Sequence, residues 1–430
     1  MAATPAPRTL AEHLNASLIS AIVVGFLLRA AGGATGILLG FYLNRVVSPP
    51  RIDPAIVAAL TAAYYAAEVV LAPVFGSWSD RIGRKPFLLA GPIIAGVAVQ
   101  LHPLTTILFV IFIGRILEGL ATSVTTPGTL GFLSDVTGGH PALRGRVMGL
   151  YELGTVLGIV VGPALGGRLW DAFERNGLRF VSLLDLAAAL LVMLYIRESR
   201  PVTQADATPA GRTLTWPERF GAYRGLFQIR RLWDFAPAWI AINGVVGLWF
   251  THADKLLSRV GRDPVQLLQG GWTGTQVSNM FLGVGLAFLL GIAFWANLYA
   301  RLRKTNIMLA AICGTFVVVL ALFGINMQVL PGPLGQWPLV PIFLAALFFE
   351  SGFTPVALAY LADITESRVK DRGTVMGLYS VFLALGNVIG AALGAPFISA
   401  FGFNGLLIAT AILASVAAAA VLNLRRNTGD

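Results

Sequence analysis

The chain alternates long apolar runs with short polar segments, and this pattern dominates every other feature of the sequence. A helix that crosses a bilayer needs about 20 predominantly apolar residues, and twelve runs come close to or exceed that length. They lie at about residues 17–43, 53–78, 86–102, 104–134, 145–168, 179–197, 235–252, 274–300, 305–328, 338–363, 373–400 and 403–424. The pattern predicts an all-α membrane protein with twelve transmembrane helices.

Part of the first half of the sequence recurs in the second half. Residues 126–167 align without a gap on residues 354–395, at a constant offset of 228, with 20 identities in 42 positions. Apolar composition alone does not produce shared polar dipeptides at equivalent positions, such as Arg144-Gly145 and Arg372-Gly373. The repeat predicts two pseudo-symmetric halves of six helices each, and repeats of this kind typically frame a binding site near the middle of the membrane.

One long polar interval divides the two halves. We expect an N-terminal half over residues 1–197, a cytoplasmic linker over 198–234 and a C-terminal half over 235–430. Within the linker, residues 216–233 alternate aromatic side chains with arginine, which favours an amphipathic helix on the membrane surface. The halves are therefore expected to form one membrane unit without a large soluble domain.

Charge adds an orientation to this picture. The chain carries a formal net charge of +10, and with the N-terminus inside, 21 basic residues fall in cytoplasmic segments against eight in external ones. Because basic residues accumulate on the cytoplasmic side, we expect a multi-pass protein of the cell membrane with both termini in the cytoplasm. The same distribution accounts for the net charge without a nucleic-acid partner. The single cysteine, Cys313, excludes an intrachain disulfide.

A basic, glycine-containing loop follows the second apolar run. Residues 76–86 read GSWSDRIGRKP, which resembles the loop signature G-x-x-x-D-R-x-G-R-K of the major facilitator superfamily. The glycines permit a tight turn, and the aspartate can cap the positive end of a neighbouring helix. In that family the aspartate latches the two halves together on the cytoplasmic side, here against the helix that begins near Gly373. The resemblance and the repeat imply a conformational latch formed by Gly76, Asp80, Arg81, Gly83, Arg84, Asp135 and Arg144.

Two further motifs lie inside apolar runs. Residues 111–121 read IFIGRILEGLA and look like the family's second motif, whose arginine, here Arg115, is thought to tune a nearby proton site. A structural pair between Arg115 and Glu118, one helical turn apart, is the alternative interpretation. The fifth run has the spacing of the motif associated with the exporter branch, the drug/proton antiporters, although small residues in this pattern also serve close helix packing. Its positions are Gly149, Gly158, Gly162, Pro163, Gly166 and Gly167.

Few ionisable side chains lie within the predicted helices, and each is a functional candidate because a charge inside a membrane is costly unless it is paired or hydrated. A carboxylate that alternates between apolar and cationic surroundings would bind a proton on one side and release it on the other. We assign proton coupling to Glu118, with Arg115 tuning it. The further candidates are Glu68, Glu152 and Glu350. Asp185, near the outer end of the sixth run, is expected to be solvated or structural.

A wall for the substrate is expected from aromatic side chains and one arginine. The candidates are Arg29, Tyr64, Tyr65, Trp249, Phe348 and Phe349. The alternative is that these rings face lipid or the protein core. His252, at the external end of the seventh run, is expected to be exposed to solvent.

The resemblance and these residues together predict secondary active export of a small amphiphilic or lipophilic compound by proton antiport with alternating access. One alternative is a lipid or lysolipid flippase, in which Arg29 and Arg115 hold an anionic headgroup, and another is a metabolite symporter or facilitator. A non-transporting receptor or assembly factor belongs to a different class. An enzyme is not expected, because the sequence lacks the P-loop, zinc-protease and nucleophile-elbow motifs, and no cofactor or metal is implied. We expect a monomer whose partners are the substrate, protons and membrane lipids.

Overall fold

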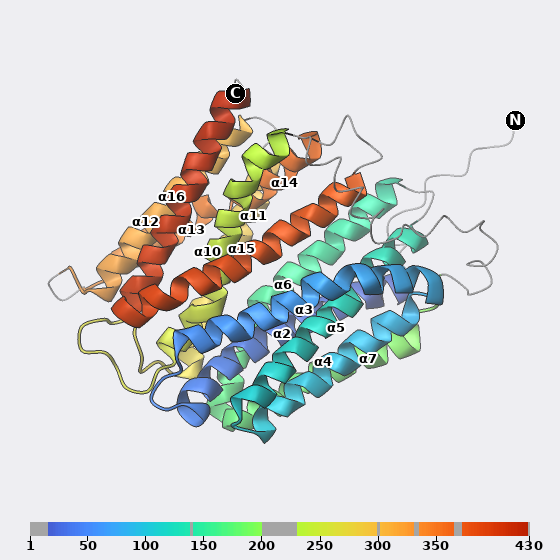
Figure 1. Cartoon of the computed structure of the whole chain (residues 1–430), viewed down its shortest axis with the longest axis horizontal. Coiled ribbons are helices and arrows are strands. Elements are labelled where there is room, and N and C mark those ends of the chain that lie inside the picture. Colours follow the sequence, from blue (N-terminus) through green and yellow to red (C-terminus); the bar gives the residue numbers. More distant parts are fainter. Residues whose placement is uncertain are drawn as a thin grey trace, which may run out of the picture. The chain divides into compact units, whose positions relative to one another are not determined.

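The computed structural model describes residues 16–137, 141–199, 230–298, 302–330, 335–364 and 372–428. Helices are the only regular elements in these ranges, as Figure 1 shows, and the all-α prediction is confirmed. The first half of the sequence forms α2 (Ala16–Tyr42), α3 (Pro54–Ile82), α4 (Lys85–Leu101), α5 (Leu108–Val136), α6 (Pro141–Phe173) and α7 (Gly177–Tyr195). The second half forms α10 (Arg230–Leu257), α11 (Gly274–Leu298), α12 (Lys304–Asn326), α13 (Leu339–Glu350), α14 (Phe353–Ile364), α15 (Arg372–Phe401) and α16 (Phe403–Thr428).

Most of these helices can cross a membrane. Within the described residues, ten stretches are long and apolar enough to do so, and one of them, Arg146–Tyr195, contains most of α6 and all of α7. Helix α10 has a suitable length of 28 residues but is not among the ten. The helices therefore support a multi-pass membrane protein, while the number twelve stays a prediction.

The tenth apolar run differs from the single helix expected over 338–363. It is divided into α13 and α14 at Ser351 and Gly352. The side chain of Trp295 on α11 occupies the space beside Gly352, where an added Cβ would lie 2.9 Å from the indole ring. The same indole donates its N–H to the carbonyl of Phe348 at 3.0 Å. The break thus packs against a residue of another helix, a contact that hydropathy does not reveal.

The helices assemble into two compact units. One comprises Met1–Gly36 and Ala66–Gly211, and the other comprises Ile37–Tyr65 and Arg212–Asp430. The C-terminal end of α2, the following loop and the start of α3 thus belong to the second unit. There the side-chain amide of Asn44 donates to the carbonyl of Lys255 at 2.7 Å, across 211 positions of sequence. Most of the predicted linker, residues 200–229, lies outside the described residues.

Each unit has its own apolar core. In the first unit, buried side chains of α2, α4, α5, α6 and α7 form one cluster that includes Leu18, Leu88 and Phe132. In the second unit, the ring of Trp239 on α10 stacks on Phe235 and on Phe353 of α14, with centroids 6.2 and 6.3 Å away. These cores fix the helices that carry the candidate site residues.

Candidate functional site

A buried ionic cluster joins α4 and α5 in the first unit. Arg115 and Glu118 lie one turn apart on α5, and an Nη1–H of Arg115 donates to Oε2 of Glu118. The second carboxylate oxygen, Oε1, lies 2.6 Å from Nε2 of His102, which directly follows α4. Glu118 is 8% exposed and His102 is completely buried. Both oxygens of this carboxylate are therefore engaged by groups that carry exchangeable protons.

Two polar atoms near this cluster lack a partner. Nδ1 of His102 and Oδ2 of Asp185 are buried and have no hydrogen bond with any residue that the structure describes. Asp185 on α7 is 2% exposed, so the expectation that it is solvated is wrong and its structural role remains. It lies close enough to Glu118 for the two carboxyl groups to interact electrostatically. Two buried polar atoms of this region are therefore without a hydrogen-bond partner among the described residues.

The other candidate carboxylates have separate surroundings. Glu68 on α3 is half-buried and interacts electrostatically with Arg29 on α2. Glu152 on α6 is exposed and accepts a hydrogen bond from Oγ of Thr155 at 3.0 Å. Glu350, the last residue of α13, is half-buried in the second unit, and its side chain makes no hydrogen bond with the described residues. Only Arg115 and Glu118, among the predicted coupling residues, share one hydrogen-bonded cluster.

The predicted substrate residues fall into separate groups. Arg29 belongs to the first unit, whereas the five aromatic residues belong to the second. Trp249 donates its indole N–H to Thr410 of α16 at 3.0 Å. Phe348 and Phe349 pack against α11, where their ring centroids lie 5.2 Å from Phe294 and 5.9 Å from Trp295, respectively. The rings of Tyr64 and Tyr65 contact each other edge to face, with centroids 5.1 Å apart.

The loop signature forms a second polar cluster in the first unit. Arg84 pairs with Asp135 of α5 at 3.1 Å and donates to Oγ of Ser79 at 2.8 Å. Glu198, which follows α7, accepts hydrogen bonds from the backbone N–H groups of Arg84 and Lys85 at 2.8 and 3.0 Å. An acidic side chain at this position offsets the positive N-terminal end of α4.

The conformation of this loop explains why a glycine is needed at position 83. Gly83 has a φ of +117°, a conformation that side chains disfavour, and a Cβ there would lie 2.6 Å from Oε2 of Glu198. Gly76 lies next to Pro127 of α5. The structure does not describe the side chains of Asp80, Arg81 and Arg144, nor those at the start of α15 around Gly373.

We expect Glu198→Ala to destabilise the first unit by about 0.5–2 kcal/mol, the usual cost of removing an acceptor from a helix N-terminus. Thermal unfolding of the purified protein in detergent measures this loss. Glu198→Gln, which keeps an acceptor oxygen, should lose less, and Arg197→Ala on the exposed neighbouring residue should have no effect. Equal stability of Glu198→Ala and Arg197→Ala would contradict the proposed contribution of Glu198.

The glycine motif of α6 lies against α2. A Cβ at Gly158 would lie 2.8 Å from Cβ of Arg29, and a Cβ at Gly162 would lie 3.0 Å from Cα of Gly33. Cδ of Pro163 lies 2.7 Å from the Cβ position of Gly33, whereas Gly149 has nothing within 4 Å of its own. Gly166 and Gly167 are buried in the same helix.

The repeated segment in the second unit packs in the same way. On α15, Cβ positions at Gly386, Gly390 and Gly394 would contact the backbone or side chains of α10. One of the α10 side chains is that of His252, whose Nε2 lies 2.8 Å from the carbonyl oxygen of Ala391. His252 is 2% exposed, so the expectation of a solvent-exposed histidine is wrong.

No group of three or more His, Cys, Asp or Glu side chains capable of holding a metal occurs among the described residues.

Comparison with known proteins gives matches over nearly the whole chain. The family profile described as Major Facilitator Superfamily matches residues 3–259 and 264–429. The chain is 32% identical over 205 residues to "Tetracycline resistance protein, class H" of Pasteurella multocida, covering 46% of the chain and half of that relative. It is 22% identical over 340 residues to "Multidrug resistance protein 2" of Bacillus subtilis (strain 168), covering 78% of each protein.

A solved structure resembles the fold. The crystal structure of a single-substitution mutant of a nucleoside transporter, NupG, superposes with a TM-score of 0.75, covering 95% of the chain and 99% of that structure. The identity is 14%, so this similarity concerns the fold alone.

Proposed function

The chain belongs to the major facilitator superfamily, and on that premise we propose that it exports a small amphiphilic or lipophilic compound by proton antiport. Membership confirms the resemblance predicted from the motifs, the major facilitator fold and the absence of an enzymatic role. The chain is a multi-pass membrane transporter for small molecules. Our proposal concerns the class of substrate, the coupling to protons and the direction of transport.

The observation that carries the proposal is the glycine and proline face of α6 against α2. Its spacing is that of the motif associated with the exporter branch. The two helices lie so close that a Cβ added at Gly158 would lie 2.8 Å from Cβ of Arg29. The relatives named for resistance to tetracycline and to multiple drugs support export. Small residues at a helix interface let the backbones of two helices approach closely.

We propose Glu118 as the coupling carboxylate. Protonation would cancel its charge, weaken the pair with Arg115 and add a donor to the 2.6 Å contact with His102. A change of protonation would thereby alter the contact between α4 and α5. Glu68, which faces Arg29 without a hydrogen bond to the described residues, is the next candidate.

The flippase alternative receives less support. It requires Arg29 and Arg115 to present free positive charge to a lipid headgroup. Arg115 is already paired with Glu118, and Arg29 interacts with Glu68. Both arginines thus have a carboxylate nearby, which favours a role in coupling over headgroup binding.

Reconstitution into liposomes tests the proposal. Tetracycline and a lipophilic cation are suitable first probes because of the names of the relatives. We expect accumulation against a concentration gradient when only a pH gradient is imposed, and collapse of accumulation when a protonophore is added. Accumulation that persists without the pH gradient would contradict proton antiport, and flux equal to that of empty liposomes for a broad panel of compounds would contradict export.

The predicted orientation has its own test. After replacement of Cys313, single cysteines near Gly138 and Gln204 should react with an impermeant thiol reagent only from the cytoplasmic side. Cysteines near Pro50 and Pro264 should react from outside, because 21 basic residues were assigned inside and eight outside. Labelling of a cysteine at position 204 in intact cells would contradict the predicted orientation.

A further inference from the structure

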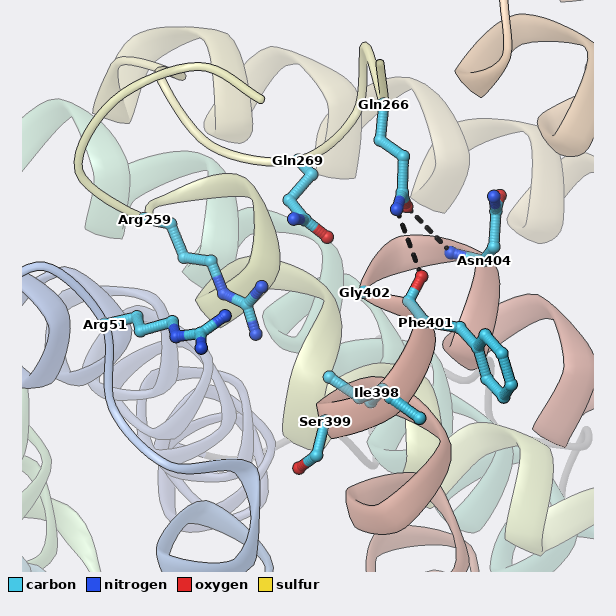
Figure 2. A pocket seen from close by; sticks show the side chains of 10 residues that line it. Arg51, Arg259, Gln266, Gln269, Ile398, Ser399, Phe401, Gly402 and Asn404 are labelled. Atoms are coloured by element: carbon cyan, nitrogen blue, oxygen red, sulfur yellow. Dashed lines mark hydrogen bonds between the residues drawn. The ribbon is translucent and has the colours of Figure 1, made fainter. Parts of the chain in front are cut away.

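A polar pocket lies at one end of the second unit. Its volume is about 360 Å³. Three segments distant in sequence form it: the residues before α3, the loop between α10 and α11, and the junction of α15 and α16 (Figure 2). The predicted orientation puts this end outside the cell.

Two arginines supply the charge of the pocket. Figure 2 shows the guanidinium groups of Arg51 and Arg259 side by side, both directed into the same space. Arg259 is only 7% exposed, and Arg51 is exposed. Among the described residues, neither guanidinium has a hydrogen bond or a carboxylate within ion-pair distance. Burial, and then the charge of Arg51, lower the pKa of Arg259 to about 10, which still leaves it protonated at pH 7.

The carboxylate of Asp263, which acts electrostatically on Arg259, is hydrogen-bonded within its own loop. Oδ1 of Asp263 accepts hydrogen bonds from the backbone N–H groups of Val265 and Gln266 at 2.9 and 2.8 Å. Its Oδ2 accepts a hydrogen bond from the side-chain amide of Gln269 at 2.8 Å. These bonds stabilise the ionised form and hold the pKa of Asp263 below its usual value. Asp263 acts on Arg259 only at longer range, so the buried guanidinium lacks a direct counter-charge.

The opposite wall of the pocket is fixed by two glutamines. The amide oxygens of Gln269 and Gln266 accept the backbone N–H groups of Phe403 and Asn404, at the start of α16, at 2.9 and 3.1 Å. The NH₂ group of Gln266 donates to the carbonyl of Phe401 at 3.1 Å, as Figure 2 shows. Gly402 has a φ of +61° and leaves no room for a Cβ against Gln269. The amides therefore hold the pocket in shape, and its unmet binding capacity resides in the two arginines.

We propose that this pocket binds a phosphate-type oxyanion between Arg51 and Arg259. Guanidinium groups match the oxygens of phosphate in geometry, and a group with more than one negative oxygen can satisfy both cations. The bound anion would connect the loop before α3 to the loop after α10. The source of the phosphate is either a free anion or the headgroup of an anionic lipid. This site is independent of the proposed export function.

Binding is tested on the purified full-length protein with two probes. Inorganic phosphate is titrated into protein in phosphate-free detergent and followed by calorimetry. In the second arm, protein in nanodiscs of phosphatidylcholine with or without phosphatidylglycerol is analysed by native mass spectrometry for retained lipid. Arg51→Gln and Arg259→Gln should weaken binding at least about tenfold, a loss of about 1.4 kcal/mol. Arg262→Gln, an exposed arginine of the same loop outside the pocket, is the matched control and should bind like the wild type.

The outcomes separate the sources. Saturable binding of inorganic phosphate that depends on both arginines identifies a free oxyanion, and selective retention of phosphatidylglycerol with the same dependence identifies a lipid headgroup. The proposal is overturned if the wild type binds neither probe, or if Arg51→Gln binds as tightly as the wild type. It is equally overturned if Arg262→Gln loses as much affinity as the two pocket variants. Because Arg51 is exposed, its variant keeps the test decisive even if Arg259→Gln fails to fold.

Discussion

Glu118→Gln is expected to abolish uphill transport driven by a pH gradient, while downhill exchange of the substrate continues. At one proton per substrate, a gradient of one pH unit sustains about a tenfold concentration ratio, since one unit is worth about 1.4 kcal/mol. The glutamine variant should reduce this ratio to about 1. The amide keeps the size of the carboxylate and can still accept a hydrogen bond from His102, but it does not exchange a proton. Accumulation and exchange in liposomes are measured side by side.

The controls separate coupling from folding. Glu118→Gln leaves the guanidinium of Arg115, 17% exposed, without its buried partner, and breaking a buried pair costs about 3–5 kcal/mol. The double variant Arg115→Gln/Glu118→Gln removes both charges and should recover part of the thermal stability without recovering uphill transport. Glu174→Gln, on an exposed residue between α6 and α7, should behave like the wild type.

Uphill accumulation by a folded Glu118→Gln variant would show that this assignment is wrong. The corresponding variants of Glu68, Glu152 and Glu350 are then tested in that order. Glu68 comes first because it faces Arg29. A variant that loses uphill accumulation and downhill exchange together, with a lowered unfolding temperature, would instead indicate that the Arg115–Glu118 pair is structural.

The sequence predicted the helices well because hydropathy is a property of each segment by itself. The all-α class and the approximate limits of α2, α3 and α5 follow from the apolar runs. The break at Ser351 and Gly352 does not follow from them, because the apolar run continues through it; the indole of Trp295 from α11 packs against this break. The membership of residues 37–65 in the second unit was not predictable either, because it rests on contacts across more than 200 positions of sequence, such as that of Asn44 with Lys255.

The candidate sites were predictable where the partners lie on one helix. The pair of Arg115 and Glu118 could be inferred from their spacing of three residues. His102 could not, because it directly follows a different helix, 16 positions from Glu118 in sequence. Glu198 was missed for the same reason, since its partners are backbone N–H groups 114 and 113 positions away. A histidine at a helix end opposite a buried carboxylate is recognisable only once α4 and α5 are packed together.

Because α6 packs closely on α2, we expect Gly158→Ala and Gly162→Ala to lower both the stability of the protein and its transport rate. A methyl group at Gly158 would lie 2.5 Å from the carbonyl oxygen of Phe26 and 2.8 Å from Cβ of Arg29. Overpacking of this kind costs about 1–3 kcal/mol because neither backbone can move away freely. The shift of α2 would also displace Arg29 from Glu68. Thermal unfolding in detergent and flux in liposomes measure the two consequences.

Gly149→Ala is the matched control because it lies on the same helix with nothing within 4 Å of its Cβ position. Replacement of a helical glycine by alanine in open space stabilises a helix by up to about 1 kcal/mol, so this variant should unfold at the wild-type temperature or above it. Gly390→Ala, where α15 meets the backbone of Gly244 on α10, should be as harmful as Gly162→Ala, since the two glycines occupy equivalent positions of the repeat. If Gly158→Ala and Gly149→Ala are equally stable and equally active, close approach of α6 to α2 is not required, and the glycine motif has another role.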